Sequence, residues 1–208
     1  MQFQEEEFAL SAEELAIVMD SAWIMAKLRI TQKVYALFGR LSHHYSDLLA
    51  MHAANAGSEV TAIAPKIYRG ESYRQLPYVM MDHPRFFKKE DVLAIRSFFW
   101  WGNHFSIHLV LGGRYKLLYE KNILKQVRLG IMDGWYVNST NDPWQHYFEP
   151  DNYGMIVNGS LPAIASDGIY LKLAKQHSLK DWQHAETFFL QSFDHLVRIL
   201  QPQPPESL

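Results

Sequence analysis

The stretch from Leu76 to Tyr119 constrains the fold most, because it holds the clearest alternation of apolar and polar residues in the chain. Between residues 104 and 111 the residues alternate between an apolar set, Phe105, Ile107, Leu109 and Leu111, and a second set, His104, Ser106, His108 and Val110. Successive side chains of a strand point to opposite faces, so this pattern predicts a strand with one apolar face. A short apolar run at Pro77–Met81, bounded by Asp82–His83–Pro84, predicts a second strand.

Residues 90–101, between these two strands, have helical spacing. Their apolar positions recur every three or four residues, at Val92, Ile95, Phe98 and Phe99. Glu90 and Asp91 suit a helix start, and Gly102–Asn103 suits its end. We therefore expect strand, helix and strand in this order, followed by a hairpin turn at Gly112–Gly113 and a further helix ending near Gly130.

Helical patterns also occupy both ends of the chain. Ser11-Ala-Glu-Glu14 is a capping box that predicts a helix to about Ala26, and a second helix is expected from about Thr31 to Ala54. The sequence leaves open whether these form one long helix bent near Arg29–Gln32. Residues 165–176 have a short helical pattern, and Ser178–Asp181 caps a last helix to about Leu200. Further strands are expected at 60–68, 73–81, 134–138 and, as the last one, 153–157.

The order of these elements predicts the fold class. Helices first, strands in the middle and helices last indicate an α+β fold, with N-terminal helices, a central and mostly antiparallel sheet, and C-terminal helices. A length of 208 residues fits one globular domain over residues 1–200. The proline-rich tail 201–208 cannot continue the last helix.

Composition excludes several classes of function. The chain has no cysteine, so disulfides, thiolate catalysis and cysteine-bound metals are excluded, which fits a cytoplasmic protein. A net charge of −2 gives no sign of nucleic-acid binding. The acidic N-terminus has no signal-peptide core, and no apolar run reaches the length of a membrane span. No nucleotide-binding glycine loop, HExxH or GxSxG motif occurs, and we expect no cofactor.

Asp82-His83-Pro84-Arg85 is the first candidate site, because it follows a predicted strand and precedes a predicted helix. Arg85 near a helix N-terminus, with Lys88 and Lys89, could hold an anion or a carboxylate. The alternative is structural, with Asp82 capping the helix or pairing with Arg85.

His104 and His108 form the second candidate. On a helix this spacing could chelate a metal, but on a strand it separates the two side chains by about 13 Å, so we expect no metal site. We expect the two histidines on a polar or solvated sheet face, or else lining a pocket with Ser106. His43, His44, Asp47 and His52 are expected to form a polar face of the second helix.

Aromatic residues supply the remaining candidates. Consecutive Trp100 and Trp101 cannot share one face, so Trp101 is a candidate for a pocket or an interface. Residues 139–152 combine turn formers with Trp144 and His146, which is typical of a loop that carries function. A lid, an interface and an ordinary packed loop all remain open.

No family resemblance guides the choice of function. The leading hypothesis is a small-molecule binding or accessory protein whose ligand, perhaps an anion, contacts the central aromatic and histidine-bearing region. The first alternative is an enzyme without a familiar motif that uses Asp, His and Arg side chains, with no catalytic residue assigned. The second alternative is a structural homo-oligomer with an aromatic interface. The enzyme requires its polar side chains to converge, whereas the binding protein requires a mostly apolar pocket with one or two polar anchors.

Overall fold

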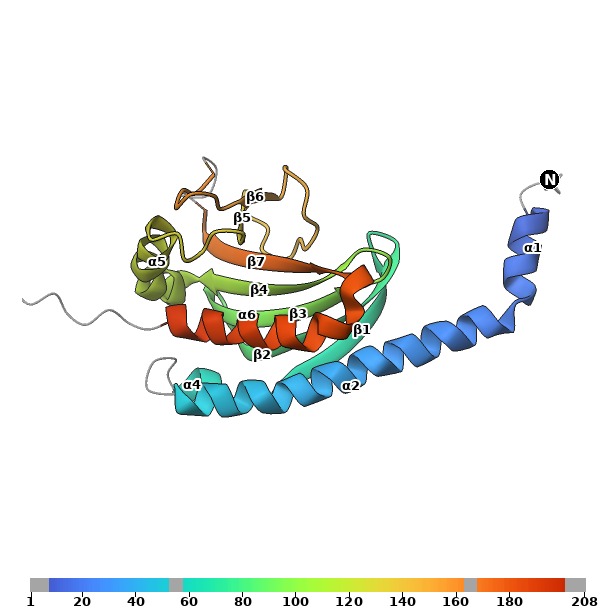
Figure 1. Cartoon of the computed structure of the whole chain (residues 1–208), viewed down its shortest axis with the longest axis horizontal. Helices are drawn as coiled ribbons and strands as arrows, with labels where there is room; N and C mark the ends of the chain where they lie inside the picture. Colours follow the sequence, from blue (N-terminus) through green and yellow to red (C-terminus); the bar gives the residue numbers. More distant parts are fainter. Residues whose placement is uncertain (1–7, 53–57, 163–167, 201–208) are drawn as a thin grey trace, which may run out of the picture.

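A seven-stranded sheet forms the centre of the computed structural model, which describes residues 8–52, 58–162 and 168–200. The strand order is β1-β2-β3-β4-β7-β5-β6, and each pairing is antiparallel. Helices precede and follow the sheet, so the predicted α+β class is confirmed (Figure 1). The single domain over residues 1–200 stays a prediction, and the tail 201–208 lies outside the described residues.

The elements follow one another along the chain in a simple order. The strands are β1 (Lys66–Tyr73), β2 (Leu76–Lys88), β3 (Asp91–Trp100), β4 (His104–Gly112), β5 (Tyr136–Asn138), β6 (Tyr153–Met155) and β7 (Tyr170–Ser178). The helices are α1 (Ala12–Met19), α2 (Ser21–Met51), α4 (Ser58–Thr61), α5 (Gly113–Arg128), the 3-10 helix η2 (Leu179–His184) and α6 (Ala185–Ile199). The strands β1 to β4 are therefore one meander, and β7 returns beside β4.

The main core lies between the sheet and its helices. Figure 1 shows α2 and α6 running along one side of the sheet, with the segment that carries β5 and β6 on the other side. Apolar side chains from the strands point towards these helices and form most of the core. They include Val79, Met81, Leu93, Ile95, Phe99, Phe105, Ile107, Leu109, Leu111, Leu171 and Leu173. Packing against these residues fixes the register, because a slip of one residue would turn the apolar set towards the opposite face.

The predicted helix over residues 90–101 is wrong, because Asp91–Trp100 is the strand β3. Nine of its ten residues are buried, since helices cover one face and residues 139–153 cover the other. A strand buried on both faces loses the alternation of apolar and polar residues, so its spacing can match a helix by chance. Gly102, with a φ of 70°, instead lies in the turn between β3 and β4.

Two further expectations near the C-terminal half are corrected. Residues 170–178 form the strand β7, so the predicted helix at 165–176 is wrong in the part that the structure describes. The strand at 153–155 was expected to be the last strand of the chain, but β7 follows it. Gly112–Gly113 is not a hairpin turn but the start of α5, and the helix expected to end near Gly130 is confirmed. The strand predicted from the alternation at 104–111 is confirmed as β4.

The capping box predicted at Ser11–Glu14 is confirmed, but the boundary between the two N-terminal helices lies earlier than expected. The Ser11 hydroxyl accepts a hydrogen bond from the Glu14 backbone N–H at 3.1 Å, and the Glu14 carboxylate accepts one from the Ser11 N–H at 2.8 Å. The two helices are separated at Asp20, whose carboxylate caps α2, while α2 runs unbroken through Arg29–Gln32. Among the described residues, no helix combines the length and apolar character needed to cross a membrane.

Candidate functional site

The face of the sheet away from α2 and α6 carries a buried polar cluster. Asp82 on β2, Arg96 on β3 and His108 on β4 are direct cross-strand neighbours. Cross-strand partners on one face have Cβ atoms about 5 Å apart, so this register alone brings the three side chains together. All three are buried, which corrects the expectation that the histidine-bearing face is solvated.

Arg96 and Asp82 form a two-point ion pair at the centre of this cluster. Arg96 Nε donates to Asp82 Oδ1 at 2.7 Å, and Nη2 donates to Oδ2 at 2.8 Å. Tyr68 on β1 accepts from Nη2 at 3.1 Å and donates to Asp82 Oδ2 at 3.3 Å. The paired carboxylate and the tyrosine raise the pKa of Arg96 against the opposing effect of burial, which is the largest single influence. The Arg96 guanidinium therefore keeps its charge inside the protein.

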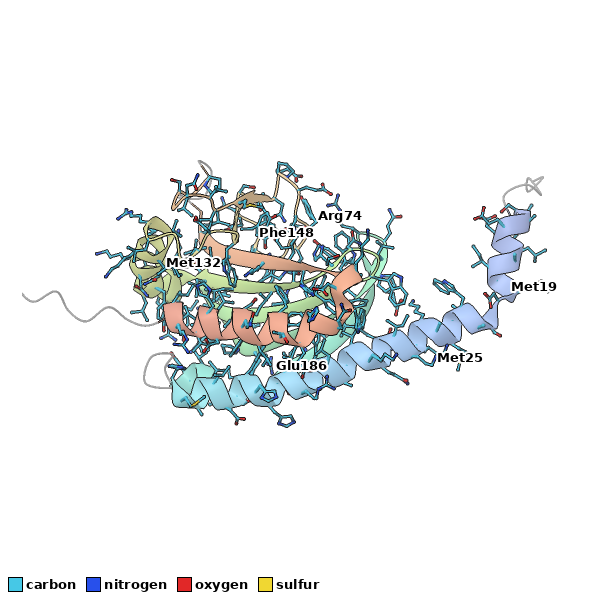
Figure 2. All side chains as sticks on the ribbon, in the orientation of Figure 1. Met19, Met25, Arg74, Met132, Phe148 and Glu186 are labelled. Carbon is cyan, nitrogen blue, oxygen red and sulfur yellow. The ribbon has the colours of Figure 1, made fainter. Side chains whose placement is uncertain are left out.

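Residues 139–152 close over this cluster without forming a regular helix or strand. His146 is its buried member, and its backbone N–H donates to the Tyr73 hydroxyl at 2.6 Å. The Trp144 ring lies 5.2 Å from the Arg96 guanidinium, within cation–π range. Phe148, labelled in Figure 2, packs against His104 and stacks on Tyr153. The segment is thus packed structure that supplies side chains to a site.

His146 joins Arg96 to Lys172, a fully buried lysine on β7. Arg96 Nη1 lies 3.0 Å from His146 Nε2, and Lys172 Nζ lies 3.1 Å from His146 Nδ1. Arginine can only donate, so Nε2 must accept, and a neutral ring then carries its proton on Nδ1. That proton points at Lys172 Nζ, which can accept it only as a neutral amine.

The surroundings of Lys172 agree with this neutral state. Burial, with the nearby Arg96 charge, lowers its pKa well below the usual value, and Asp142 only partly opposes the shift. Within the described residues Lys172 has no ion pair with a carboxylate; its Nζ donates to the Gln145 backbone carbonyl. Burial, with the nearby Arg96 charge, likewise holds the pKa of His146 well below its usual value.

We predict that Lys172 is uncharged at neutral pH. Carbon-13 NMR of the lysine Cε groups, followed from acid to alkaline pH, should show one resonance that titrates well below the others. Lys172→Met should remove that resonance and no other. If all lysines titrate near their usual pKa of about 10.4, the proton assignment on His146 is wrong.

His108 and His104 flank this chain of contacts on β4. His108 lies between two hydroxyls, with Ser106 at 2.8 Å from Nε2 and Tyr153 at 3.0 Å from Nδ1. His104 has a buried Nε2 without a hydrogen-bond partner among the described residues. Burial lowers the pKa of His108 well below its usual value and that of His104 to about 4. Both are therefore neutral side chains that lie outside the pocket beside the cluster.

A pocket of about 520 Å³ opens beside the cluster. Its floor contains Asp82, Arg96 and His146, and Lys66 and Arg85 add two cations. The remaining lining is mostly aromatic: Tyr68, Tyr73, Tyr78, Met80, Phe87 and Trp144. Lys172 and His108 do not line it, so His146 separates the pocket from the buried amine.

A bulge in β2 brings Arg85 to the same face as Asp82. Asp82 pairs with Arg96 and Arg85 with Ala94, so two residues of β2 stand opposite one residue of β3. The extra residue reverses the alternation, and Arg85 therefore faces the pocket instead of the helices. Sequence reasoning could not see this shift, because it depends on the pairing of two strands.

Comparison with protein-family models, curated proteins and solved structures found no match for this chain. Its site must therefore be interpreted from its own geometry. Four residues proposed from the sequence line the pocket, namely Asp82, Arg85, Trp144 and His146. The pocket residues that sequence reasoning missed are Lys66, Tyr68, Tyr73, Tyr78, Met80, Phe87 and Arg96.

Other proposed site residues lie elsewhere. His83 faces α2, where its Nε2 lies 3.0 Å from the Ser46 hydroxyl, and burial lowers its pKa to about 4. Trp101 packs on Phe99 at the edge of the helix-side core. The prediction that Arg85 lies at a helix N-terminus is wrong, because residues 85–88 belong to the strand β2.

The histidines do not assemble a metal site in the described part of the chain, where no three His, Cys, Asp or Glu side chains are close enough to hold an ion. His104 and His108 lie four residues apart on one strand, as the alternation predicted, and the resulting separation of about 13 Å is too large for both to bind one metal ion. His43 and His44 are exposed on α2.

Proposed function

We propose that this protein binds a small anionic ligand with a flat apolar part in the pocket beside Arg96. The observation that carries the proposal is the composition of that pocket: aromatic walls, three cations and a single acid. Ligand sites are mostly apolar cavities with a few placed polar groups, which this pocket resembles in size and lining. The absence of cysteine supports placing the protein in the cytoplasm.

The charges of the pocket support an anion. Asp82 is already bound at two points by Arg96, whereas Lys66 and Arg85 bring charge that no acid in the lining neutralises. Four of the five Arg96 N–H groups have partners within the protein. The fifth, on Nη1, has none among the described residues and is available to a carboxylate or a similar group.

The walls of the pocket support a flat ligand. Trp144 is 42% exposed and stands 5.7 Å from the Phe87 ring, so its indole is accessible from the pocket. Tyr73 and Tyr78, which also line the pocket, meet edge to face. Aromatic side chains favour stacking with other rings, so an aromatic or otherwise planar anion fits this lining.

Binding is favoured over catalysis because few polar side chains in the pocket are free to act as an acid or a base. Asp82 and Arg96 neutralise each other, while His83, His104 and His108 lie outside the pocket lining. An enzyme acting in the same pocket is the second candidate, and Lys172 favours it. A ligand that displaced Arg96 Nη1 from His146 Nε2 could give a proton to Nε2, while the proton on Nδ1 passes to the neutral Lys172 amine. A bound ligand recovered chemically changed after incubation with the wild type, but not with Lys172→Met, would support this second candidate.

Calorimetric titration with 2-naphthoate tests the proposal, with the uncharged 2-naphthalenemethanol as a matched ligand. We expect the carboxylate to bind at least about tenfold more tightly than the alcohol. Trp144→Ala should weaken naphthoate binding about tenfold by removing one wall, and Lys66→Gln should reduce the preference for the anion.

Trp23→Ala is the matched control, because Trp23 is half-exposed on α2 and lies outside the pocket lining. It should leave binding unchanged. The proposal is contradicted if naphthoate does not bind, or if Trp144→Ala and Trp23→Ala weaken binding equally.

A further inference from the structure

The N-terminal arm, residues 8–30, exposes a run of large apolar side chains on two consecutive helices. It comprises α1 and the first turns of α2, and Figure 1 shows it projecting beyond the sheet. None of its residues is buried. Its exposed apolar side chains are Phe8, Leu10, Leu15, Ile17, Val18, Met19, Trp23, Ile24, Met25 and Leu28.

The arm continues the same helix that forms part of the core. From Thr31 onwards α2 buries Val34, Phe38, Leu41 and Tyr45 at three- and four-residue spacing. Before Thr31 that face continues as Ile24 and Trp23, but the sheet and α6 no longer cover it. Figure 2 shows Met19 and Met25 far from the body of the molecule. Exposed apolar side chains gathered on one segment are typical of a surface that contacts another molecule.

We propose that the arm pairs with the arm of a second copy of this chain, in antiparallel orientation about a twofold axis near Trp23. The distribution of charge along the arm favours a second copy of the arm as its partner. The acids Glu13, Glu14 and Asp20 precede Trp23, and the bases Lys27, Arg29 and Lys33 follow it. Figure 1 shows α1, with Glu13 and Glu14, turning away from α2 at Asp20, so Asp20 is the acid that lies in line with α2. Antiparallel pairing about Trp23 sets Asp20 of each arm near the basic part of the other, whereas parallel pairing sets like charges together.

The position of Trp23 agrees with this arrangement. Large aromatic side chains near the centre of an interface contribute most of its binding energy. In a twofold interface the same residue contacts its own copy at the axis, so Trp23, Ile24 and their copies would form the apolar centre. Lys27 also pairs with Glu71 on β1 at 2.6 Å, which leaves Arg29 and Lys33 for the second copy.

Sedimentation velocity of the full chain over a concentration series tests the proposal. We expect a dimer, and Ile24→Asp should raise its dissociation constant at least about 100-fold by placing a charge at the apolar centre. Leu117→Asp is the matched control, because Leu117 is 77% exposed on α5 and far from the arm. It should leave the dimer intact.

Cross-linking in the cysteine-free chain tests the orientation. Ala22→Cys lies beside the proposed axis, so a short bifunctional maleimide should join two copies. In antiparallel arms two Gln32→Cys sites are about 27 Å apart along the helices and should not cross-link. Cross-linking of Gln32→Cys would indicate parallel arms and overturn the proposal.

A monomer at every concentration would also overturn it. If that monomer bound neutral phosphatidylcholine vesicles, and Ile24→Asp abolished the binding, the arm would be assigned to a lipid surface instead. Pocket binding of 2-naphthoate is measured separately and does not depend on the outcome.

Discussion

Asp82→Ala is expected to lower the free energy of unfolding by about 3–5 kcal/mol. The substitution leaves the Arg96 guanidinium only 7% exposed and without the carboxylate that binds it at two points. Removing one partner of a buried ion pair leaves an uncompensated charge in a medium of low polarity, which is why the loss is large. Urea denaturation followed by far-ultraviolet circular dichroism measures it.

An exposed ion pair of the same protein provides the control. Glu149 accepts from Arg74 at 3.4 Å, and both side chains are largely solvated. Glu149→Ala should therefore change stability by less than about 1 kcal/mol. An equally small effect for Asp82→Ala would show that water in the pocket solvates the Arg96 charge, and it would contradict a buried ion pair at this position.

A double substitution measures the interaction between Asp82 and Arg96 apart from the contacts that each makes with other residues. Asp82→Ala combined with Arg96→Met removes both charges, so it should destabilise the protein by less than the sum of the two single substitutions. His146 and Tyr68 each lose one Arg96 contact in the double variant, so part of the loss should remain. A strictly additive result would mean that Asp82 and Arg96 do not depend on each other.

The alternation of β4 could be interpreted correctly from sequence because its two faces differ in chemistry. One face of residues 104–111 is apolar and the other carries His104, Ser106 and His108, so the period of two is visible. In β3 the face opposite the helices holds Phe98 and Trp100 as well as Arg96. With apolar residues on both faces, spacing alone could not separate a strand from a helix.

The site was only partly predictable for a related reason. Asp82 and Arg85 were proposed because they follow a predicted strand, and Trp144 and His146 because they belong to a loop rich in turn formers and aromatic residues. Arg96 was missed because it lay in a segment assigned to a helix, and only the pairing of β2 with β3 places it opposite Asp82. Lys172 was missed because a lysine is expected in water, and no local signal marks one that is fully buried.

Acidification is expected to unfold this protein through its buried histidines. Burial lowers the pKa of His83 and His104 from about 6.5 to about 4, and it holds those of His108 and His146 well below the usual value. In the unfolded chain all four take up a proton below about pH 6.5, whereas the folded protein excludes it. The stability they contribute is therefore complete above pH 6.5 and is lost as the pH falls towards 4.

The size of the effect follows from the number of protons. Each histidine that is protonated only in the unfolded chain lowers the free energy of unfolding by about 1.4 kcal/mol per pH unit. A total stability of about 5–15 kcal/mol would then be largely lost before pH 4. Urea denaturation at half-unit intervals from pH 7.5 to about 4.5 measures the slope.

His104→Phe should make this dependence on pH less steep, by about 1.4 kcal/mol per pH unit between pH 6 and 4.5. Phenylalanine can keep the ring contacts with Phe148 and Trp100, and it removes a buried Nε2 that has no partner among the described residues. His44→Gln alters an exposed histidine on α2 and should leave the slope as it is in the wild type. If both variants retain the wild-type slope, His104 is protonated in the folded protein, and residues 139–152 do not seal this face of the sheet from water.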